Sequence, residues 1–596
     1  MPTKVQRHLL NDVSLAGPAH ERTVFPGSND DEQPVTLAPP AERRAAIDAL
    51  HGTWIPRTLA QHLDAMVELF ADEPFIITDD QTWTYRQIQD WSVRLAAGLY
   101  EMGIRKGEHV VVVMANHPEF VALKFAIARL GATSVPANFL LRERELGYVI
   151  EQSDAVAVIA MDQFRDMDYV AMLDSMMPGW AENGGGTVFP KVRNVIVFSA
   201  DGTARECQSL GDVEALGTGA TAQTVSEKVG PVDPSSFSDI LYTSGTTGVS
   251  KGVLLRHDMI LRAAYASAHS RAITPGHRCV FSLAMYHVFG YIECMLAVSF
   301  VGGAVVPQLV FDPADMLNAV SRHRLDEMVA VPTMTFALLD EARANSYDLS
   351  TLTIMYSSGG AAPASIWSEI NEVFQPEEVA MGYGQTETTA AATRYFPEDP
   401  DEMLTGSHGK FRPAGIAGDL AEYKTIDLVT GRDLPRGEQG ELMVRGLMVT
   451  PGYYNKPQET AATIDENGWL HTGDIGIVGA DDSVLLTGRV KESYRCGGEM
   501  VMPTEVEAVL SAFPGVAQAH VAGIPHDRMG EVGCAFVVAD AGGQLTEAAL
   551  IAHCKSELAR FKVPAHVLFV DVEDLPLTVT ARVQKFRLVE MAQDML

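Results

Sequence analysis

Short runs of consecutive apolar residues alternate with helical patterns along most of the chain. Seven of these runs have the length and composition of strands that are buried on both faces, as strands of parallel sheets are. They cover residues 109–114, 155–160, 194–198, 239–242, 279–283, 328–331 and 352–356. From Leu59 onward, apolar residues recur every three or four positions, which predicts that a packed helix begins the globular part. The alternation predicts an α/β fold.

The two ends of the chain differ from this pattern. Residues 1–53 are rich in proline and charge and show little periodicity, so we expect an N-terminal extension before the globular part. Glycines and charges interrupt the chain near 489–492, and a compact region of strands and helices follows. The pattern therefore predicts a large domain at 54–488 and a small one at 493–596.

Composition narrows the class of protein. The 596 residues are 47% hydrophobic and carry a formal net charge of −32, which argues against nucleic acid as a partner. Six scattered cysteines without a C-x-x-C pair favour a reduced, cytoplasmic chain over a disulfide scaffold. The longest uncharged run, 294–311, is broken by Gly302, Gly303 and Pro307 and predicts a buried helix, turn and strand, not a transmembrane segment. Peripheral contact with a membrane remains open.

A loop rich in glycine and hydroxyl groups follows the predicted strand at 239–242. Its glycines allow backbone N–H groups to approach phosphate oxygens, its hydroxyls add donors, and Lys251 supplies a positive charge. The spacing differs from that of a P-loop NTPase. The loop residues expected at the phosphates are Thr243, Ser244, Gly245, Thr246, Thr247, Gly248 and Lys251.

This loop resembles the phosphate-binding signature of the ANL superfamily of adenylate-forming enzymes. Seven further segments match that superfamily in order over about residues 55–590, among them Tyr383-Gly384-Gln385-Thr386-Glu387 and the segment that ends at Asp474. The resemblance implies stacked parallel or mixed sheets in the large domain and a mobile α+β C-terminal domain. It also implies that Thr386 contacts the α-phosphate, that Glu387 holds Mg²⁺, and that Asp474 contacts the ribose.

The same resemblance assigns the segment between the domains. Arg489 is expected at the ribose, Lys491 at the pivot of a hinge spanning 489–492, and the loop with Gly497 and Gly498 at the channel for a thiol substrate. One position departs from the superfamily: its closing lysine is Arg582 here, preceded by Ala581. Arginine keeps the charge but is a broad planar fork, so the change is not conservative at a tight site. We expect Thr246, Lys251, Glu387 and Arg582 to act in catalysis, with Lys585 as an alternative to Arg582.

A pocket for the acyl group is expected where several predicted strands end. His287 follows the strand at 279–283 and resembles a histidine that flanks the acyl site in this superfamily. Amino-acid-activating relatives carry an aspartate in this segment, and none is present here, so we expect an apolar acid. The predicted lining consists of His287, Val331, Met334, Gly359, Gly360, Ala361 and Met381.

The function implied is that of an acyl-CoA synthetase with ATP, Mg²⁺ and coenzyme A as cofactors. A fatty, branched or aromatic carboxylic acid would form an acyl-adenylate and then an acyl-CoA, with AMP and pyrophosphate released. Two alternatives stay open: transfer of the acyl group to a carrier-protein phosphopantetheine, and a catalytically impaired nucleotide-binding relative, suggested by Arg582. The partners are then small molecules, and a homodimer is left open by the sequence.

Overall fold

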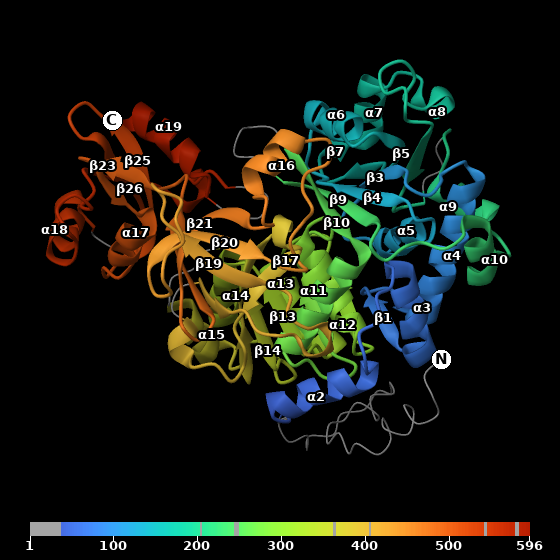
Figure 1. Cartoon of the computed structure of the whole chain (residues 1–596), viewed down its shortest axis with the longest axis horizontal. Helices are drawn as coiled ribbons and strands as arrows, with labels where there is room; N and C mark the ends of the chain where they lie inside the picture. The colour runs from blue at the N-terminus through green and yellow to red at the C-terminus, as the bar shows by residue number, and fades with distance from the viewer. Residues whose placement is uncertain are drawn as a thin grey trace.

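The computed structural model describes residues 37–202, 206–243, 250–360, 365–404, 407–540, 545–577 and 583–596. The chain forms a large part built on three sheets and a small C-terminal part with a sheet of its own. The small part lies at one end of the molecule, beside the strands β19–β21 of the large part (Figure 1).

Two sheets in the large part are mainly parallel. The first has the order β15-β14-β13-β11-β12-β1-β2, and the second the order β10-β9-β4-β3-β5-β8. The strands of the first sheet are β15 (Glu378–Ala380), β14 (Ile354–Ser357), β13 (Glu327–Ala330), β11 (Arg278–Phe281), β12 (Ala304–Pro307), β1 (Pro74–Ile77) and β2 (Thr82–Thr84). Those of the second are β10 (Lys251–Arg256), β9 (Phe237–Thr243), β4 (Thr133–Ala137), β3 (His109–Val113), β5 (Ala155–Met161) and β8 (Asn194–Phe198). All seven predicted strands are present, which confirms that continuous apolar runs mark strands covered on both faces.

The third sheet of the large part is antiparallel and has the order β16-β17-β18-β22-β21-β20-β19. Its strands are β16 (Gly382–Gln385), β17 (Ala390–Arg394), β18 (Ser407–Lys410), β22 (Ser483–Arg489), β21 (Leu470–Val478), β20 (Gln439–Arg445) and β19 (Glu422–Ile426). The first two form a hairpin around the 3₁₀ turn η3 (Thr386–Thr388), which carries the predicted Thr386 and Glu387. A two-stranded ribbon, β6 (Gln163–Phe164) and β7 (Met167–Asp168), lies beside the second sheet.

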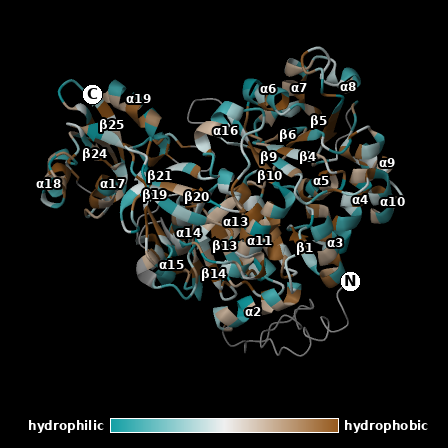
Figure 2. Cartoon of the chain, in the orientation of Figure 1, coloured by the Kyte–Doolittle hydropathy of each residue, from teal (hydrophilic) through white to brown (hydrophobic). Residues whose placement is uncertain are grey.

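Helices cover the two parallel sheets. The core between them joins side chains of both, for example Val111 of β3 and Cys279 of β11, with Tyr265 of the central helix α11 (His257–Ser270). A π-helix, η2 (Phe289–Leu296), packs on α11 and continues as α12 (Ala297–Ser299) before β12, so the predicted buried helix, turn and strand are confirmed. Hydrophobic residues gather at this centre and polar ones at the periphery (Figure 2).

The remaining helices of the large part lie between and around these strands. They are α3 (Leu59–Phe70), α4 (Tyr85–Glu101), α5 (Pro118–Arg129), α6 (Glu143–Gln152), α7 (Tyr169–Met176), α8 (Trp180–Asn183), α9 (Leu210–Leu216), α10 (Ala222–Val229), α13 (Pro313–His323), α14 (Pro332–Ala344), α15 (Ser365–Val373) and α16 (Pro457–Thr463). Short 3₁₀ turns are η4 (Asp401–Leu404) and η5 (Gly415–Ala417). The helix predicted from Leu59 is α3, and its capping box on Thr58 fixes the start.

The packed part of the chain begins before the helix predicted from Leu59, because another helix lies within the segment expected to be an N-terminal extension. The helix α2 (Pro40–His51) lies under the first sheet, where Arg43 is buried and pairs with Glu378 of β15 while Arg43 Nη1 donates to the carbonyl of Ala272 at 2.7 Å. Ile47 is its one buried aliphatic side chain. The helix is therefore held mainly by polar contacts, and hydrophobic periodicity could not reveal it.

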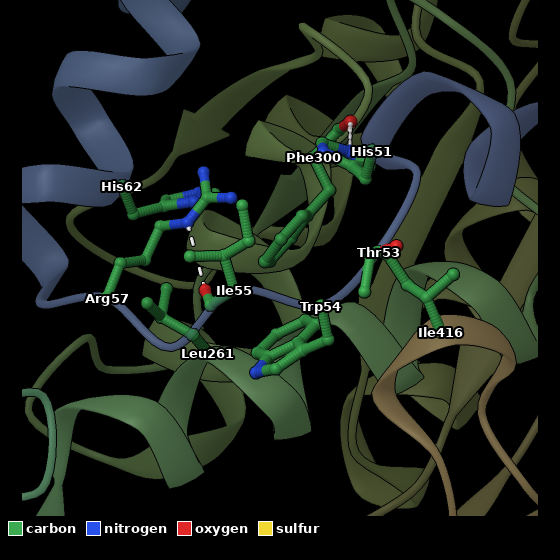
Figure 3. A pocket seen from close by; sticks show the side chains of 9 residues that line it. All are labelled: His51, Thr53, Trp54, Ile55, Arg57, His62, Leu261, Phe300 and Ile416. Atoms are coloured by element: carbon green, nitrogen blue, oxygen red, sulfur yellow. Dashed lines mark hydrogen bonds between the residues drawn. The ribbon is translucent and has the colours of Figure 1, made fainter. Parts of the chain in front are cut away.

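The segment after α2 lines a pocket of about 260 Å³, a volume that includes open solvent (Figure 3). His51 Nε2 lies 2.7 Å from the carbonyl oxygen of Phe300, and because a carbonyl only accepts, this nitrogen carries the proton. Trp54 Nε1 donates to Asp258 at 2.9 Å. These contacts fasten the connection between α2 and α3 to the ends of α11 and α12.

The small part has its own hydrophobic core and a sheet of five strands. Strand order is β24-β23-β26-β25, with β27 paired in parallel to β26. Its elements are β23 (Tyr494–Cys496), β24 (Glu499–Val501), α17 (Pro503–Ser511), β25 (Val516–His526), β26 (Gly530–Ala539), α18 (Glu547–Glu557), β27 (His566–Phe569), η6 (Val572–Asp574) and α19 (Lys585–Met595). The α/β class of the large domain and the α+β class of the small one are thus confirmed.

The structure also bears on the compartment and on membrane insertion. All six cysteines are free thiols, and five of them are buried. Among the described residues, no helix combines the length and the apolar character that crossing a bilayer requires.

Candidate active site

The predicted phosphate loop leaves the second sheet at its antiparallel edge. Thr243 ends β9 and pairs with Lys251, the first residue of β10. Ser244, Gly245, Thr246, Thr247 and Gly248 lie outside the described residues, so the structure fixes the two ends of this loop. Lys251 Nζ lies 4.7 Å from the centre of the Tyr453 ring, a cation–π distance that orients the amine.

Tyr453 links this amine to Glu387. Tyr453 donates its hydroxyl to Glu387 Oε1 at 2.9 Å, and the bridge between Val253 and Tyr453 joins the tyrosine to β10. Burial raises the pKa of the Glu387 carboxyl, while the hydrogen bond from Tyr453 and the charges of Lys251 and Arg489 oppose that rise. The carboxyl is therefore buried, and a further positive charge beside it would favour its ionised form.

Asp474 forms a second centre. The hydroxyl of Tyr383 donates to Asp474 Oδ2 at 2.8 Å, and Arg489 Nε is 2.8 Å from Asp474 Oδ1. Asp474 and Arg489 face each other on β21 and β22, so the sheet register brings them together. The side chain of Asp474 is 5% exposed and that of Arg489 40%, so the pair has a buried end and an open end.

The hairpin that carries Glu387 requires a glycine. A Cβ on Gly384 would lie 1.8 Å from the carbonyl oxygen of Ala390, so no larger residue fits there without displacing the backbone. Thr386 is buried in the turn. Thr450 donates its backbone N–H to the carbonyl of Glu387 at 2.8 Å, which fixes the hairpin to the segment before Tyr453.

Two of the residues predicted for the acyl pocket, Val331 and Gly359, lie close to each other after the ends of β13 and β14. A Cβ on Gly359, whose φ is +89°, would lie 3.3 Å from Val331 and 3.4 Å from Phe289, so these three residues touch. His287 lies in the segment between β11 and η2, and burial lowers its pKa to about 4, which keeps the imidazole neutral.

The other predicted lining residues follow the same strand ends. Gly360 lies against Pro332, and Ser282 approaches the sulfur of Met334 at 3.9 Å. Met381 is buried directly before β16, while Ala361 lies outside the described residues. The aromatic wall formed by Phe289 and Tyr356, whose rings are 5.2 Å apart, was not predicted.

Gly497 and Gly498 are not brought to this site. They form the turn between β23 and β24 of the small part, where the N–H of Gly497 donates to the carbonyl of Met529 at 2.8 Å.

Lys491 lies in the turn after β22, between the two parts of the chain. Arg582 lies outside the described residues. Lys585, the alternative cation, is held 2.6 Å from Glu507 and 3.6 Å from Glu492.

Sequence reasoning missed two residues that organise the site. Tyr453 lies 66 positions after Glu387, in a turn-rich segment that indicates no partner. Glu293 is a buried carboxylate on η2. Its one sequence signal was a single acid inside an otherwise apolar helical segment.

Comparison with known proteins agrees with this geometry. Residues 63–454 match the family model of the AMP-binding enzymes, and residues 505–582 match the model of the AMP-binding enzyme C-terminal domain. A putative acyl-CoA synthetase of Bacillus subtilis, YngI, is 31% identical over 91% of this chain and 98% of its own. A Mycobacterium tuberculosis CoA ligase named for an indenyl-propanoyl substrate is 34% identical over 90% of this chain and 99% of its own. The ATP-bound crystal structure of MatB from Rhodopseudomonas palustris superimposes with a TM-score of 0.77 at 27% identity, covering 90% of this chain and 99% of MatB.

Proposed function

Since the chain belongs to the family of AMP-binding enzymes, we propose that it activates a carboxylic acid with ATP and transfers the acyl group to coenzyme A. It is an AMP-forming acid–thiol ligase. One observation carries the proposal beyond the family: Lys251, Glu387 and Arg489 come from three distant segments, yet the charges of both cations act on the carboxyl of Glu387. Such a group of cations around one buried acid suits a triphosphate and its metal ion.

The first half-reaction requires positive charge and N–H donors. The carboxylate of the substrate attacks the α-phosphorus of ATP, the bond to the β-phosphate oxygen breaks, and pyrophosphate leaves. Lys251 and the loop after Thr243 bind phosphate oxygens and stabilise the charge that develops on them. Asp474, oriented by Tyr383 and Arg489, accepts hydrogen bonds from the ribose hydroxyls.

The donors at Glu387 fit a magnesium ion bound jointly with ATP. Among the described residues, no group of three or more acidic, histidine or cysteine side chains can hold a metal alone. Mg²⁺ commonly binds through one or two carboxylates together with substrate phosphates, and one buried carboxylate is what this site provides. When bound, the ion neutralises phosphate charge as pyrophosphate departs.

The second half-reaction needs no protein nucleophile. The thiol of coenzyme A attacks the carbonyl carbon of the acyl-adenylate, and AMP leaves with the bonding electrons. We assign residues 54–488 to adenylation, 489–492 to the hinge and 493–596 to the mobile domain. Rotation of the small domain about Lys491 would remove the segment with Arg582 from the active site and bring in the turn with Gly497 and Gly498.

The acid is apolar. His287 is neutral, and Phe289, Val331 and Met334 offer aromatic and aliphatic surface without a carboxylate to pair an ammonium group. We propose a fatty, branched or aromatic acid, a cytoplasmic location in keeping with six free thiols, and no role for nucleic acid. A homodimer is part of the same hypothesis.

Pyrophosphate release over a panel of short, medium, long and aromatic acids tests the function, with and without coenzyme A. We expect acid-dependent pyrophosphate and consumption of the thiol. Acid-dependent pyrophosphate without consumption of coenzyme A would favour a carrier-protein acceptor. ATP binding without pyrophosphate for any acid would favour the impaired relative, for which the replacement of lysine by Arg582 is the supporting observation.

A further inference from the structure

Glu293 is a buried carboxylate that contacts four donors from three other elements. Its Oε1 accepts the backbone N–H of Ala391 at 2.9 Å and Arg394 Nη2 at 3.3 Å, both on β17. Its Oε2 accepts the hydroxyl of Tyr356 on β14 at 3.3 Å and that of Ser267 on α11. The side chain is 3% exposed, so the four hydrogen bonds replace all the water that a carboxylate would otherwise bind.

The contact with Ala391 occurs at the strained end of the nucleotide-site hairpin. Thr389 and Ala390, which precede it, have φ values of +64° and +145°, a region that residues with side chains seldom adopt. The β16–β17 register also shifts between Tyr383 and Gly384, next to Ala391. Such a backbone persists only where its surroundings fix it, and Glu293 fixes the residue that follows the strain.

The opposite side of Glu293 leads to the acyl pocket. Tyr356 lies against Phe289, and it precedes the loop with Gly359 by three residues. Tyr356 Oη would also lie 3.1 Å from a Cβ on Gly382, at the start of the hairpin. Glu293 itself belongs to η2, a π-helix that begins two residues after His287, and single π turns often occur at functional sites.

We propose that Glu293 is a positioning residue that fixes the hairpin with Thr386 and Glu387 to the helix and strand that line the acyl pocket. The inference rests on the proposed function, because it assigns the hairpin to ATP and the helix to the acid. Glu293 touches neither substrate. It acts through Ala391 on the hairpin and through Tyr356 on the acyl loop, so one buried carboxylate sets the distance between the two reactants.

The experiment compares Glu293→Ala, Glu293→Gln and the control Glu327→Gln. Glu327 is a fully buried carboxylate of β13 in the same polar core, where it contacts Arg271 and His277; among the described residues it makes no hydrogen bond or ion pair with the hairpin. We expect Glu293→Ala to lower kcat on the order of 10- to 100-fold and to raise the KM for ATP, as displaced reactive groups do. Glu293→Gln should restore most of kcat, because its amide oxygen can accept from Ala391 while the two hydroxyls reverse to accept its N–H groups. Glu327→Gln should lower Tm but leave both kinetic constants unchanged.

Wild-type kinetics in Glu293→Ala, or an equal kinetic loss in Glu327→Gln, would overturn the proposal. If Glu293→Ala does not fold, the pair Tyr356→Phe and Ser267→Ala replaces it, and the expectation is a change in kcat and KM for the first variant only. ATP affinity measured by calorimetry requires no turnover. It therefore tests Glu293 even if the wild-type protein forms no acyl-CoA: equal affinity in wild type and Glu293→Ala counts against positioning, whereas an inactive wild type counts against the proposed function.

Discussion

The hydroxyl of Tyr383 donates to the carboxylate of Asp474 at 2.8 Å, although the two residues are 91 positions apart. Arg489 holds the other carboxylate oxygen at the same distance. The aspartate is thereby fixed in one orientation, with the hairpin on one side and the segment between the two parts of the chain on the other. Asp474 thus connects the proposed nucleotide site with the proposed hinge.

Removal of this hydroxyl should weaken ATP binding. A hydrogen bond to a charged group contributes about 1.5–3 kcal/mol, so Tyr383→Phe is expected to raise the KM for ATP about tenfold or more, with a smaller change for the acid. Pyrophosphate release under varied ATP provides the measurement. Tyr423→Phe is the matched control, because the Tyr423 hydroxyl is buried near Asp474 and has no hydrogen-bond partner within the described part of the chain. An equal rise in both variants would show a general effect of removing a hydroxyl here.

Glu387 should set the acid limb of the pH profile. Its pKa is raised by burial, so it takes up a proton at a higher pH than an ordinary glutamate with a pKa near 4.5. The hydrogen bond from Tyr453 favours the ionised form, so Tyr453→Phe should raise the pKa further and shift the loss of kcat/KM for ATP toward neutral pH. Pyrophosphate release between pH 4 and 8 at fixed Mg²⁺ would record the direction of the shift.

Tyr454→Phe serves as the control for this profile. The Tyr454 hydroxyl donates to Asp154 at 3.0 Å and not to Glu387, so the acid limb should stay in place. A profile that moves equally in both variants, or that moves toward lower pH in Tyr453→Phe, would contradict the role of Tyr453.

Gly384 should tolerate no side chain. The Cβ of Gly384→Ala would lie 1.8 Å from the carbonyl oxygen of Ala390, and relief of such a clash needs a backbone shift in the hairpin. We expect the free energy of unfolding to fall by roughly 3 kcal/mol or more, together with loss of activity. Gly211→Ala is the comparison: its Cβ would have Ser209 Oγ at 3.7 Å as its nearest neighbour, so a change between zero and a gain of about 1 kcal/mol is expected. Urea denaturation of both variants would measure the two changes in the free energy of unfolding, and equal changes would contradict the prediction.

Arg582→Lys tests which side chain supplies the positive charge for adenylation. The substitution should raise the adenylation rate, because a compact ammonium group replaces a planar guanidinium. Lys585→Gln should leave that rate unchanged, since Lys585 is engaged by Glu507 of the small part and by Glu492 of the proposed hinge. Single-turnover formation of the acyl-adenylate is the measurement. An unchanged or lower rate in Arg582→Lys would contradict the expected gain, and a large loss in Lys585→Gln would favour Lys585 as the working cation.

Sequence analysis predicted the strands well because each is a continuous apolar run covered on both faces, as in 109–113 and 155–161. It also located Asp474 and Arg489, whose pairing then followed from sheet register. It could not supply Tyr453 or Glu293, because their partners are distant in the chain and their role depends on which side chain of the fold they face. The helix α2 was not predicted for a related reason: it is anchored by Arg43, and arginine is a residue type typical of surfaces.

The docking of α2 has a consequence for how the chain can be divided. Arg43 contacts both Glu378 and the carbonyl of Ala272, and Asp48 accepts the hydroxyl of Tyr265, so this helix makes side-chain contacts of its own with β15 and α11. A break in the exposed backbone around Gly52 would therefore leave α2 as a bound peptide. A polypeptide lacking everything before Thr53 would expose this face of the first sheet and leave Glu378 without Arg43, and a synthetic copy of the helix, added in trans, should bind there again.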